Sequence, residues 1–410
     1  MGNPSNLGAM RFADESSWGE TSTTFDERLE IIAPIDASGL TQEMQVVDPV
    51  VQFQNDGAVP MRGVQGGSFT VSLYLCGHGS ATTGAVTATA EENFISRCLG
   101  NLNVANDGGT VSGTTSTTVF ATGSVSTMTD GSLIRLGSLG DSKGGGQFYA
   151  CTESSGTITL KTALPAQVAS SDVIYAPAQI YPSEAGTSSS ITSQRIEIIT
   201  ANQSYHCFGC YPTGISISGL NPGEIPKVDI TMGVSRWNSY NTTFPTTTSV
   251  NSFVPSPVAA GSFFFQTYGT TTRATKSIRE FSLNLDFGVT EIRGPGATNA
   301  HQVIVGAKRT KCQASFDFVI DSEAANTTTF EDLWNTAEGS QTFKHVLYTC
   351  SAGRDGASIG FYFPKVHLTG ARPTQMDMDG VNRQRISCRA VTDSGKTTAL
   401  ERANFILGMG

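Results

Sequence analysis

The chain has 410 residues, room for roughly two or three domains, and no apolar run approaches the ~20 residues that a membrane helix needs. Only 15% of the residues are charged, and glycine, serine, threonine and β-branched residues are abundant, which favours strands and turns. The net charge of -9 argues against a general nucleic-acid-binding surface. We therefore expect a mainly β protein with a few short helices.

The N-terminal region carries most of the charge imbalance, because residues 1–60 hold ten acidic groups against Arg11 and Arg28. It lacks the basic start and apolar core of a signal peptide, so we expect synthesis in a cytoplasm. Residues 1–40 fit an extended arm that is anchored on a neighbour by Trp18 and Phe25. A strand folded on its own chain fits equally well. The arm would face basic groups: Arg273, Lys276, Arg279, Lys308, Arg309 and Lys311.

One pattern then occurs twice. Arg62 precedes the alternating run Ser68–Leu75, and Arg309 precedes Ser315–Asp321 at the same spacing. Alternation of apolar and polar side chains at period two predicts a strand in each case. The second run is less regular, because Val319 is apolar on the other face.

Each predicted strand is followed by an amphipathic stretch with helical spacing of its apolar residues. The first stretch is Glu91–Leu102 and the second is Thr328–Gly339. Gly100 and Gly339 are typical stop residues, so we expect two short helices.

A third matching element completes the repeat. Cys210–Leu220 resembles Phe361–Ala371: each is an alternating strand followed by glycine, a proline-containing turn and a further strand. Three elements in one order favour a duplicated module over chance similarity.

The domain organisation follows from the repeat. Residues 104–182 interrupt the first copy with five strand signals separated by turn residues, which predicts an inserted β-barrel or sandwich. The expected boundaries are these: an N-terminal arm, 1–40; a first module, 41–103 and 183–237; an inserted β subdomain, 104–182; a linker, 238–272; and a second module, 273–410.

Sequences that could carry chemistry lack their required context. Gly140–Gly144 and Gly356–Gly360 have nucleophile-elbow spacing, but extended sequence follows where a helix is needed. Ala390–Thr397 approximates a phosphate-binding loop with its first glycine replaced, so a turn at Ser394-Gly395 is expected. Asp377–Gly380 lacks the outer ligands of a calcium loop.

His206-Cys207-x-x-Cys210 begins like a zinc knuckle, but no second ligand pair completes it. Eight scattered cysteines favour reduced, buried thiols over disulfides: Cys76, Cys98, Cys151, Cys207, Cys210, Cys312, Cys350 and Cys388. The five histidines stand apart in the sequence. We therefore expect no catalytic, cofactor or metal site, and a protein that is not an enzyme.

The opening ESSWGETST, the region from Arg62-Gly63 to Leu75 and above all Tyr211–Trp237 resemble the major tail tube proteins of long-tailed bacteriophages (siphoviruses). This resemblance covers about residues 12–100 and 183–237, and reaches the second module only through the repeat. It implies modules of two packed β-sheets flanked by a helix. Rings of such modules stack into a hollow tube, a virion component of the phage tail through which double-stranded DNA passes.

Tube rings of single modules are usually hexamers, so the resemblance implies a trimer with pseudo-sixfold symmetry for a duplicated chain. It also implies tape measure, tail terminator and distal tail proteins as partners, an outward-facing insert and no membrane.

Two other functions stay open. A distal tail or tube-capping ring shares the module but does not polymerise. A carbohydrate-binding, adhesin-like protein would use exposed aromatic side chains of the insert, for which the candidates are Phe120, Phe148, Tyr149, Tyr175 and Tyr181.

Overall fold

The computed structural model describes most of the chain, and every structural statement concerns the described residues. They are residues 9–20, 25, 27–29, 31–32, 35–47, 59–77, 87–104, 108–114, 116–122, 128–137, 146–170, 172–182, 191–199, 203–240, 257–258, 260–295, 302–321, 343–351, 358–369, 374–378 and 381–410. The predicted second helix, Thr328–Gly339, lies outside them.

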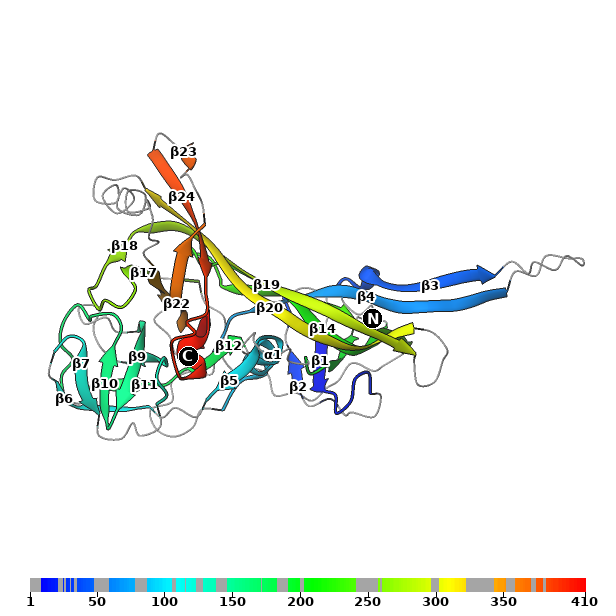
Figure 1. The fold of residues 1–410 in the computed structure, drawn as a ribbon, viewed down its shortest axis with the longest axis horizontal. Helices are drawn as coiled ribbons and strands as arrows, with labels where there is room; N and C mark the ends of the chain where they lie inside the picture. Colours follow the sequence, from blue (N-terminus) through cyan, green and yellow to red (C-terminus); the bar gives the residue numbers. More distant parts are fainter. Residues whose placement is uncertain are drawn as a thin grey trace, which may run out of the picture.

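The protein is mainly β, as the composition predicts (Figure 1). Its described residues form one large sheet of 19 strands and a closed barrel of six. Among the described residues, no helix is long and apolar enough to cross a membrane. The strands before the barrel and the first helix are β1 (Ala9–Asp14), β2 (Glu27–Leu29), β3 (Leu40–Val47), β4 (Val59–Tyr74), α1 (Ala90–Leu99) and β5 (Gly100–Asn103), with a 3-10 turn at Ala37–Gly39.

Four strands of the first half follow one another across the large sheet in the order β3, β4, β15, β14. The later elements of this half are β12 (Ala178–Pro182), β13 (Gln194–Ile199), β14 (Ser204–Ser218), β15 (Lys227–Val234) and β16 (Arg236–Tyr240). On β4 the apolar set that alternation predicts, from Phe69 to Leu75, is buried. The turn from β14 to β15 requires Gly219, where φ is +71° and a Cβ would lie 2.1 Å from the Ile225 carbonyl oxygen.

The second half repeats this order as β19, β20, β24, β22. Its elements are β17 (Ala260–Thr267), β18 (Thr275–Lys276), β19 (Ile278–Pro295), β20 (Gln302–Asp321), β21 (Lys344–Ser351), β22 (Ser358–Leu368), β23 (Thr374–Met378), β24 (Val381–Ala390), α3 (Ala399–Arg402) and β25 (Ile406–Met409). Phe316, Phe318 and Ile320 are buried, and so is Val319, which matches the irregular alternation. The second half has an additional strand, β23, which comes between β22 and β24 in the sequence and pairs with β24.

The strands β14 and β22 occupy matching positions in the two halves. The first part of β14 pairs with β13 and β16, and the first part of β22 pairs with β21 and β25. The later part of each strand pairs with the strand that follows the turn, β15 or β24. One continuous apolar core runs through both halves and includes Phe94 of α1 and Phe316 of β20.

The first predicted helix is confirmed as α1. Thr89 and Glu92 form a capping box, in which the Thr89 hydroxyl accepts from the Glu92 N–H and the Glu92 carboxylate accepts from the Thr89 N–H. Gly100 ends the helix with φ of 121°, as its position predicts.

The insert contains a closed six-stranded barrel, which agrees with the barrel alternative. Its strands are β6 (Gly109–Thr114), β7 (Val119–Thr122), β8 (Leu133–Leu136), β9 (Phe148–Ser154), β10 (Thr157–Leu160) and β11 (Val173–Tyr175). The sequence signals missed β6, whose GTVSGT lacks a clear apolar alternation. The last expected strand is divided, because β12 leaves the barrel and pairs with β5 and β25 in the large sheet.

The expected linker is partly a strand. Ala260–Thr267 forms β17, which pairs with β21 along its whole length. Phe263 and Phe265 are buried in the main core on one side of this strand, and Phe264 is buried against the barrel on the other. Apolar side chains on both faces therefore make this segment part of the second half rather than a connector.

The described part of the N-terminal segment lies on its own chain. Strand β1 pairs with both β13 and β2. Trp18 donates its indole N–H to the Ser235 hydroxyl at 2.8 Å, and the guanidinium groups of Arg11 and Arg195 lie 4.9 and 4.5 Å from the centre of the Phe25 ring. The two predicted aromatic anchors therefore have contacts within the chain, which agrees with the alternative of a strand folded on its own chain.

Candidate assembly interface

The two halves meet through a long hairpin. Strands β19 and β20 belong to the second half, and their far end extends across the first half (Figure 1). Residues Leu283–Asp286 of β19 pair with Gly214–Ile217 of β14, so the strands of the two halves form one continuous sheet. Backbone pairing of this kind would join separate chains equally well.

A buried arginine fixes the hairpin to the first half. Arg309 of β20 is 5% exposed and donates two hydrogen bonds to the last carbonyl groups of α1, at Leu99 (2.6 Å) and Cys98 (2.5 Å). These carbonyls have no partner within the helix, and a cation is favourable at the negative end of the helix dipole. The guanidinium also lies 4.2 Å from the centre of the Phe287 ring. Burial lowers the pKa of Arg309.

The far end of the hairpin packs on the same half. The Tyr211 hydroxyl donates to Glu291 at 2.6 Å. Burial opposes ionisation of Glu291, but hydrogen bonds from Tyr211 and Arg293 outweigh it and hold its pKa below the ordinary value. Beside this pair, an apolar cluster joins the two halves: it contains Ile191, Tyr211, Ile304 and Ala307, with Trp18 and Val289 packed against it.

The hairpin of the first half has the same construction. In β3–β4 the register shifts between Gln42 and Met44, so that Met44 faces Arg62. In β19–β20 it shifts between Gly288 and Val289, so that Val289 faces Arg309. The arginines that the sequence pattern aligned therefore stand at matching positions beside matching β-bulges, features that re-aim a strand.

The surroundings of the two hairpins differ. The far part of β3–β4 projects away from the body (Figure 1). Within the described structure, Val59–Gln65 of β4 pairs only with β3, whereas Gly67–Tyr74 also pairs with β15. The indole N–H of Trp237 reaches the Thr41 carbonyl at 3.3 Å, near the base of the hairpin. A two-stranded ribbon without a packing surface is only marginally stable in water.

Two of the remaining basic candidates for contacts with an N-terminal arm, Arg273 and Lys311, have partners within the chain. Arg273 reaches the Tyr149 hydroxyl and the Ala163 carbonyl, and its guanidinium lies 4.7 Å from the centre of the Phe264 ring. Lys311 pairs with Asp286 at 2.6 Å on the exposed face of the hairpin.

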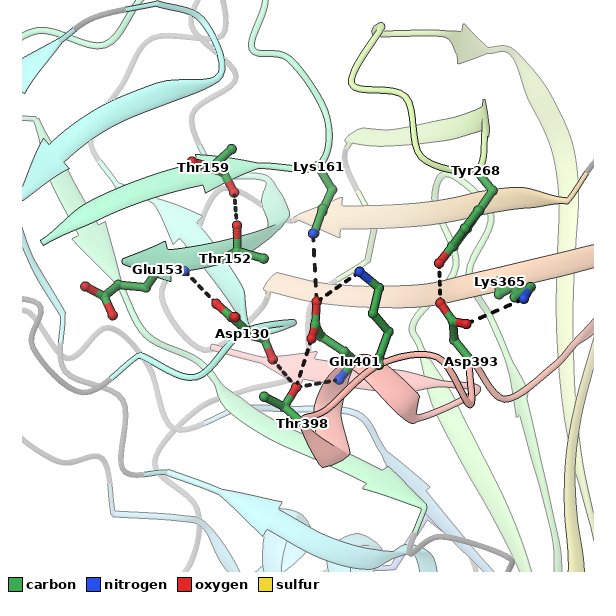
Figure 2. Close-up of polar contacts among 11 residues, drawn as sticks. Asp130, Thr152, Glu153, Thr159, Lys161, Tyr268, Lys365, Asp393, Thr398 and Glu401 are labelled. Atoms are coloured by element: carbon green, nitrogen blue, oxygen red, sulfur yellow. Dashed lines mark hydrogen bonds and ion pairs between the residues drawn. The ribbon is translucent and has the colours of Figure 1, made fainter. Parts of the chain in front are cut away.

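Several polar contacts attach the barrel to the second half (Figure 2). The Thr398 hydroxyl donates to the Asp130 carbonyl at 2.8 Å. Glu401 lies 4.0 Å from Lys161 of the barrel side and 3.7 Å from Lys396. An apolar contact accompanies them: it joins Leu133, Phe148 and Ala150 of the barrel to Phe264, Leu347, Tyr362, Leu400, Ala403 and Ile406. The insert thus interrupts the first half in sequence but packs on the second in space.

The sequence Ala390–Thr397 is a turn, as expected. The Lys396 N–H donates to the Asp393 carbonyl at 3.1 Å, and the α3 helix that follows has only four residues. The Asp393 side chain accepts from Tyr268 and lies 3.5 Å from Lys365 (Figure 2). Burial opposes ionisation of Asp393, but these two partners outweigh it and lower its pKa.

The other chemical candidates do not come together. Ser358 begins β22, is fully buried and accepts from Arg135 at 3.2 Å, so it is not on a strained turn. The Nε2 atom of His206 lies 2.8 Å from a carboxylate oxygen of Glu197, whereas Cys207 and Cys210 lie in the core. Gly140–Gly144 lies outside the described residues, as do Asp379 and Gly380. No group of three metal-ligating side chains occurs in the described part.

All eight cysteines are described and buried, as expected from their scatter. Burial raises the pKa of Cys76 to about 12 and that of Cys350 likewise to about 12, so these thiols are poor nucleophiles. Of the aromatic residues that would serve an adhesin, Phe120, Phe148 and Tyr149 are fully buried.

The sequence did not place Tyr211, Glu291 and the contacts of Arg309 at the joint between the two halves. The repeated arginine was the available signal, but a sequence pattern does not reveal which helix an arginine meets. No protein-family model matches the chain, and no curated protein is significantly similar to it.

Proposed function

We propose that the chain is a structural virion protein that assembles into rings, and that the rings stack into the tail tube of a long-tailed phage. The observation that carries this proposal is the joint between the two halves, where β14 pairs with β19 and Arg309 meets α1. If the halves are two copies of one module, the same joint between chains would continue the sheet from one subunit to the next.

In this proposal each half is a two-sheet module. The first sheet is the series β3, β4, β15, β14 or its counterpart, and the second contains the strands that pair with the early part of β14 or β22. Three chains supply six modules, so the ring is a trimer with pseudo-sixfold symmetry. Double-stranded DNA passes through it without specific binding. Tape measure, tail terminator and distal tail proteins are its partners in the phage tail.

Stacking of rings needs an exposed surface, and the hairpin β19–β20 supplies one. Ile292 and Val305 are each 41% exposed, and they are the two large apolar side chains exposed in the described part of the chain. They lie on the same hairpin as the buried Arg309 but are open to solvent. Burial of such side chains between rings would favour a tube over a single ring.

Electron microscopy and mass photometry of the purified full chain test this function. We expect tubes or trimeric rings, and a monomer at high concentration would contradict assembly. Six chains in each ring would contradict the duplicated module while leaving the tube function standing.

The double variant Ile292→Asp, Val305→Asp separates a tube from a distal tail or tube-capping ring. Charged side chains would repel each other in a stacked contact, so we expect single rings from this variant and tubes from the unmodified chain. Single rings from both proteins would favour the capping function.

A further inference from the structure

We infer that a cavity between the barrel and the second half binds a short, uncharged carbohydrate. The cavity has a volume of about 350 Å³, which lies in the range of small-molecule sites and leaves room for roughly one or two sugar rings. Its walls come from the barrel strand β10, the segment after β17, the strands β21 and β22, and the segment that ends in α3. This inference goes beyond the proposed function and does not depend on it.

The charged side chains of the cavity wall balance one another. The wall contains two lysines, Lys161 and Lys396, and two carboxylates, Asp393 and Glu401. Glu401 lies 4.0 Å from Lys161 and 3.7 Å from Lys396, and Asp393 lies 3.5 Å from Lys365 (Figure 2). A phosphate or a metal cation would compete with these pairs and would gain little net attraction. The wall therefore favours an uncharged ligand.

The uncharged part of the wall offers both donors and acceptors of hydrogen bonds. It includes the hydroxyl-bearing residues Tyr268, Thr159 and Thr270, and also His345. Burial, with a smaller effect from Lys161, lowers the pKa of His345 to about 4, so at neutral pH its ring has one donor and one acceptor nitrogen. Sugar hydroxyl groups donate and accept at once, which suits such a wall. The half-buried ring of Tyr268 adds a flat surface for the apolar face of a sugar.

A buried amide next to the wall lacks a partner. Gln266 faces His345 across β17 and β21 and is 2% exposed. Its amide oxygen accepts from the Thr162 hydroxyl at 3.0 Å and contacts the His345 ring, but its amide nitrogen has no hydrogen-bond partner in the described structure. The same position would stay unpaired if the amide were turned over. Because a buried polar group without a partner is costly, a hydroxyl group that reaches it would stabilise the complex.

Isothermal titration calorimetry of the full chain tests the ligand class. The uncharged probes are glucose, galactose, N-acetylglucosamine, maltose and lactose, and the charged probes are inorganic phosphate and glucuronate. We expect at least one uncharged probe to bind with a dissociation constant of about 1 mM or lower, and neither charged probe to displace it. Absence of binding by every uncharged probe at ~20 mM would overturn the inference, and so would binding of the charged probes alone.

The variant Thr271→Trp, with Thr272→Trp as its matched control, tests the location. Both threonines are exposed, but only Thr271 lines the cavity. An indole at position 271 should occupy the cavity and weaken binding by about tenfold or more, whereas the control should bind like the unmodified chain. Thermal melting shows whether each variant folds.

The variant Tyr268→Phe keeps the ring and the volume of the wall but removes one hydroxyl group. It should weaken binding by about fivefold, the effect of one hydrogen bond, and it decides the location if Thr271→Trp does not fold. Unchanged affinity in the folded variants would place the sugar elsewhere and overturn the inference. The monomer suffices for these measurements, so their outcome is separate from that of ring assembly.

Discussion

The two long hairpins of this protein share a backbone construction but lie in different surroundings. β19–β20 carries Arg309 beside a β-bulge and packs on the other half of its own chain. β3–β4 carries Arg62 beside a bulge at the matching position and projects from the body (Figure 1). The hairpins therefore differ in what they pack against, since their backbone construction is shared.

This contrast separates folding from assembly. Contacts of the docked hairpin should contribute to the stability of the monomer, because their partners are in the same chain. The far part of β3–β4 pairs with no further strand of the described structure, so substitutions there should change monomer stability less. Four predictions test this separation, in decreasing order of expected effect.

Replacement of Arg309 by alanine should lower the free energy of unfolding of the monomer by about 3 kcal/mol. The carbonyls of Cys98 and Leu99 would lose their donor, and a cavity would form beside Phe287. Urea denaturation measures the change, and Arg309→Lys is the control that keeps the charge. An unchanged free energy of unfolding would contradict the comparison, because the contacts of Arg309 would then not stabilise the monomer.

The body should show an acid sensitivity that neither hairpin affects. Burial, with a smaller effect from Lys161, lowers the pKa of His345 to about 4. Below pH ~6.5 the unfolded chain binds a proton that the folded chain does not, so stability falls between pH ~6.5 and about 4, by about 2–3 kcal/mol.

The variant His345→Gln should lose most of this slope in denaturation experiments at pH 7 and pH 5. Arg62→Ala should keep it, because His345 lies on β21, where its ring contacts Gln266. A slope that changed with Arg62 would mean that the projecting hairpin is coupled to the body.

Replacement of Tyr211 by phenylalanine should cost about 1 kcal/mol of monomer stability, since it removes the hydrogen bond to Glu291. The pKa of Glu291 is below its ordinary value, so this contribution is present at neutral pH and is lost as the pH falls through the lowered pKa. Tyr205→Phe is the matched control on the same strand, because its hydroxyl binds the exposed Gln203. Equal effects of the two substitutions would argue against a specific contact at the hairpin end.

The smallest effect is expected for Lys311→Ala. The pair with Asp286 joins two half-exposed side chains on the outer face of the docked hairpin, so its loss should change monomer stability by ~0.5 kcal/mol or less. Denaturation at low and high salt measures it. A loss well above 1 kcal/mol would show that the outer face of this hairpin also stabilises the fold.

Much of the local structure could be predicted because it depends on short-range patterns. Alternation identified β4, β19 and β20, and the spacing around Phe94 with a glycine stop identified α1. Segments without these signals were missed or misjudged. β6 is polar and glycine-rich, β17 was assigned to a linker, and β23 lies where the repeat predicted a proline-containing turn.

The pairing register of the strands could not be predicted either, because apolar alternation is a short-range signal. The repeat aligns Ile215 with Val366, yet Ile215 faces Ile230 whereas Val366 faces Ala390, because β23 takes the early part of β24. Register depends on the whole sheet, since a strand can satisfy its own alternation at several offsets.

The sequence by itself determined the β-rich class, the inserted β unit, the buried thiols and the two matching arginines. These features follow from composition, period and spacing, which act over a few residues. The tertiary structure decided that Arg309 meets α1, that the barrel packs on the second half, and that β3–β4 projects. Those outcomes join residues up to 268 positions apart, as Thr398 and Asp130 show. Only the packed chain brings such groups within hydrogen-bond distance.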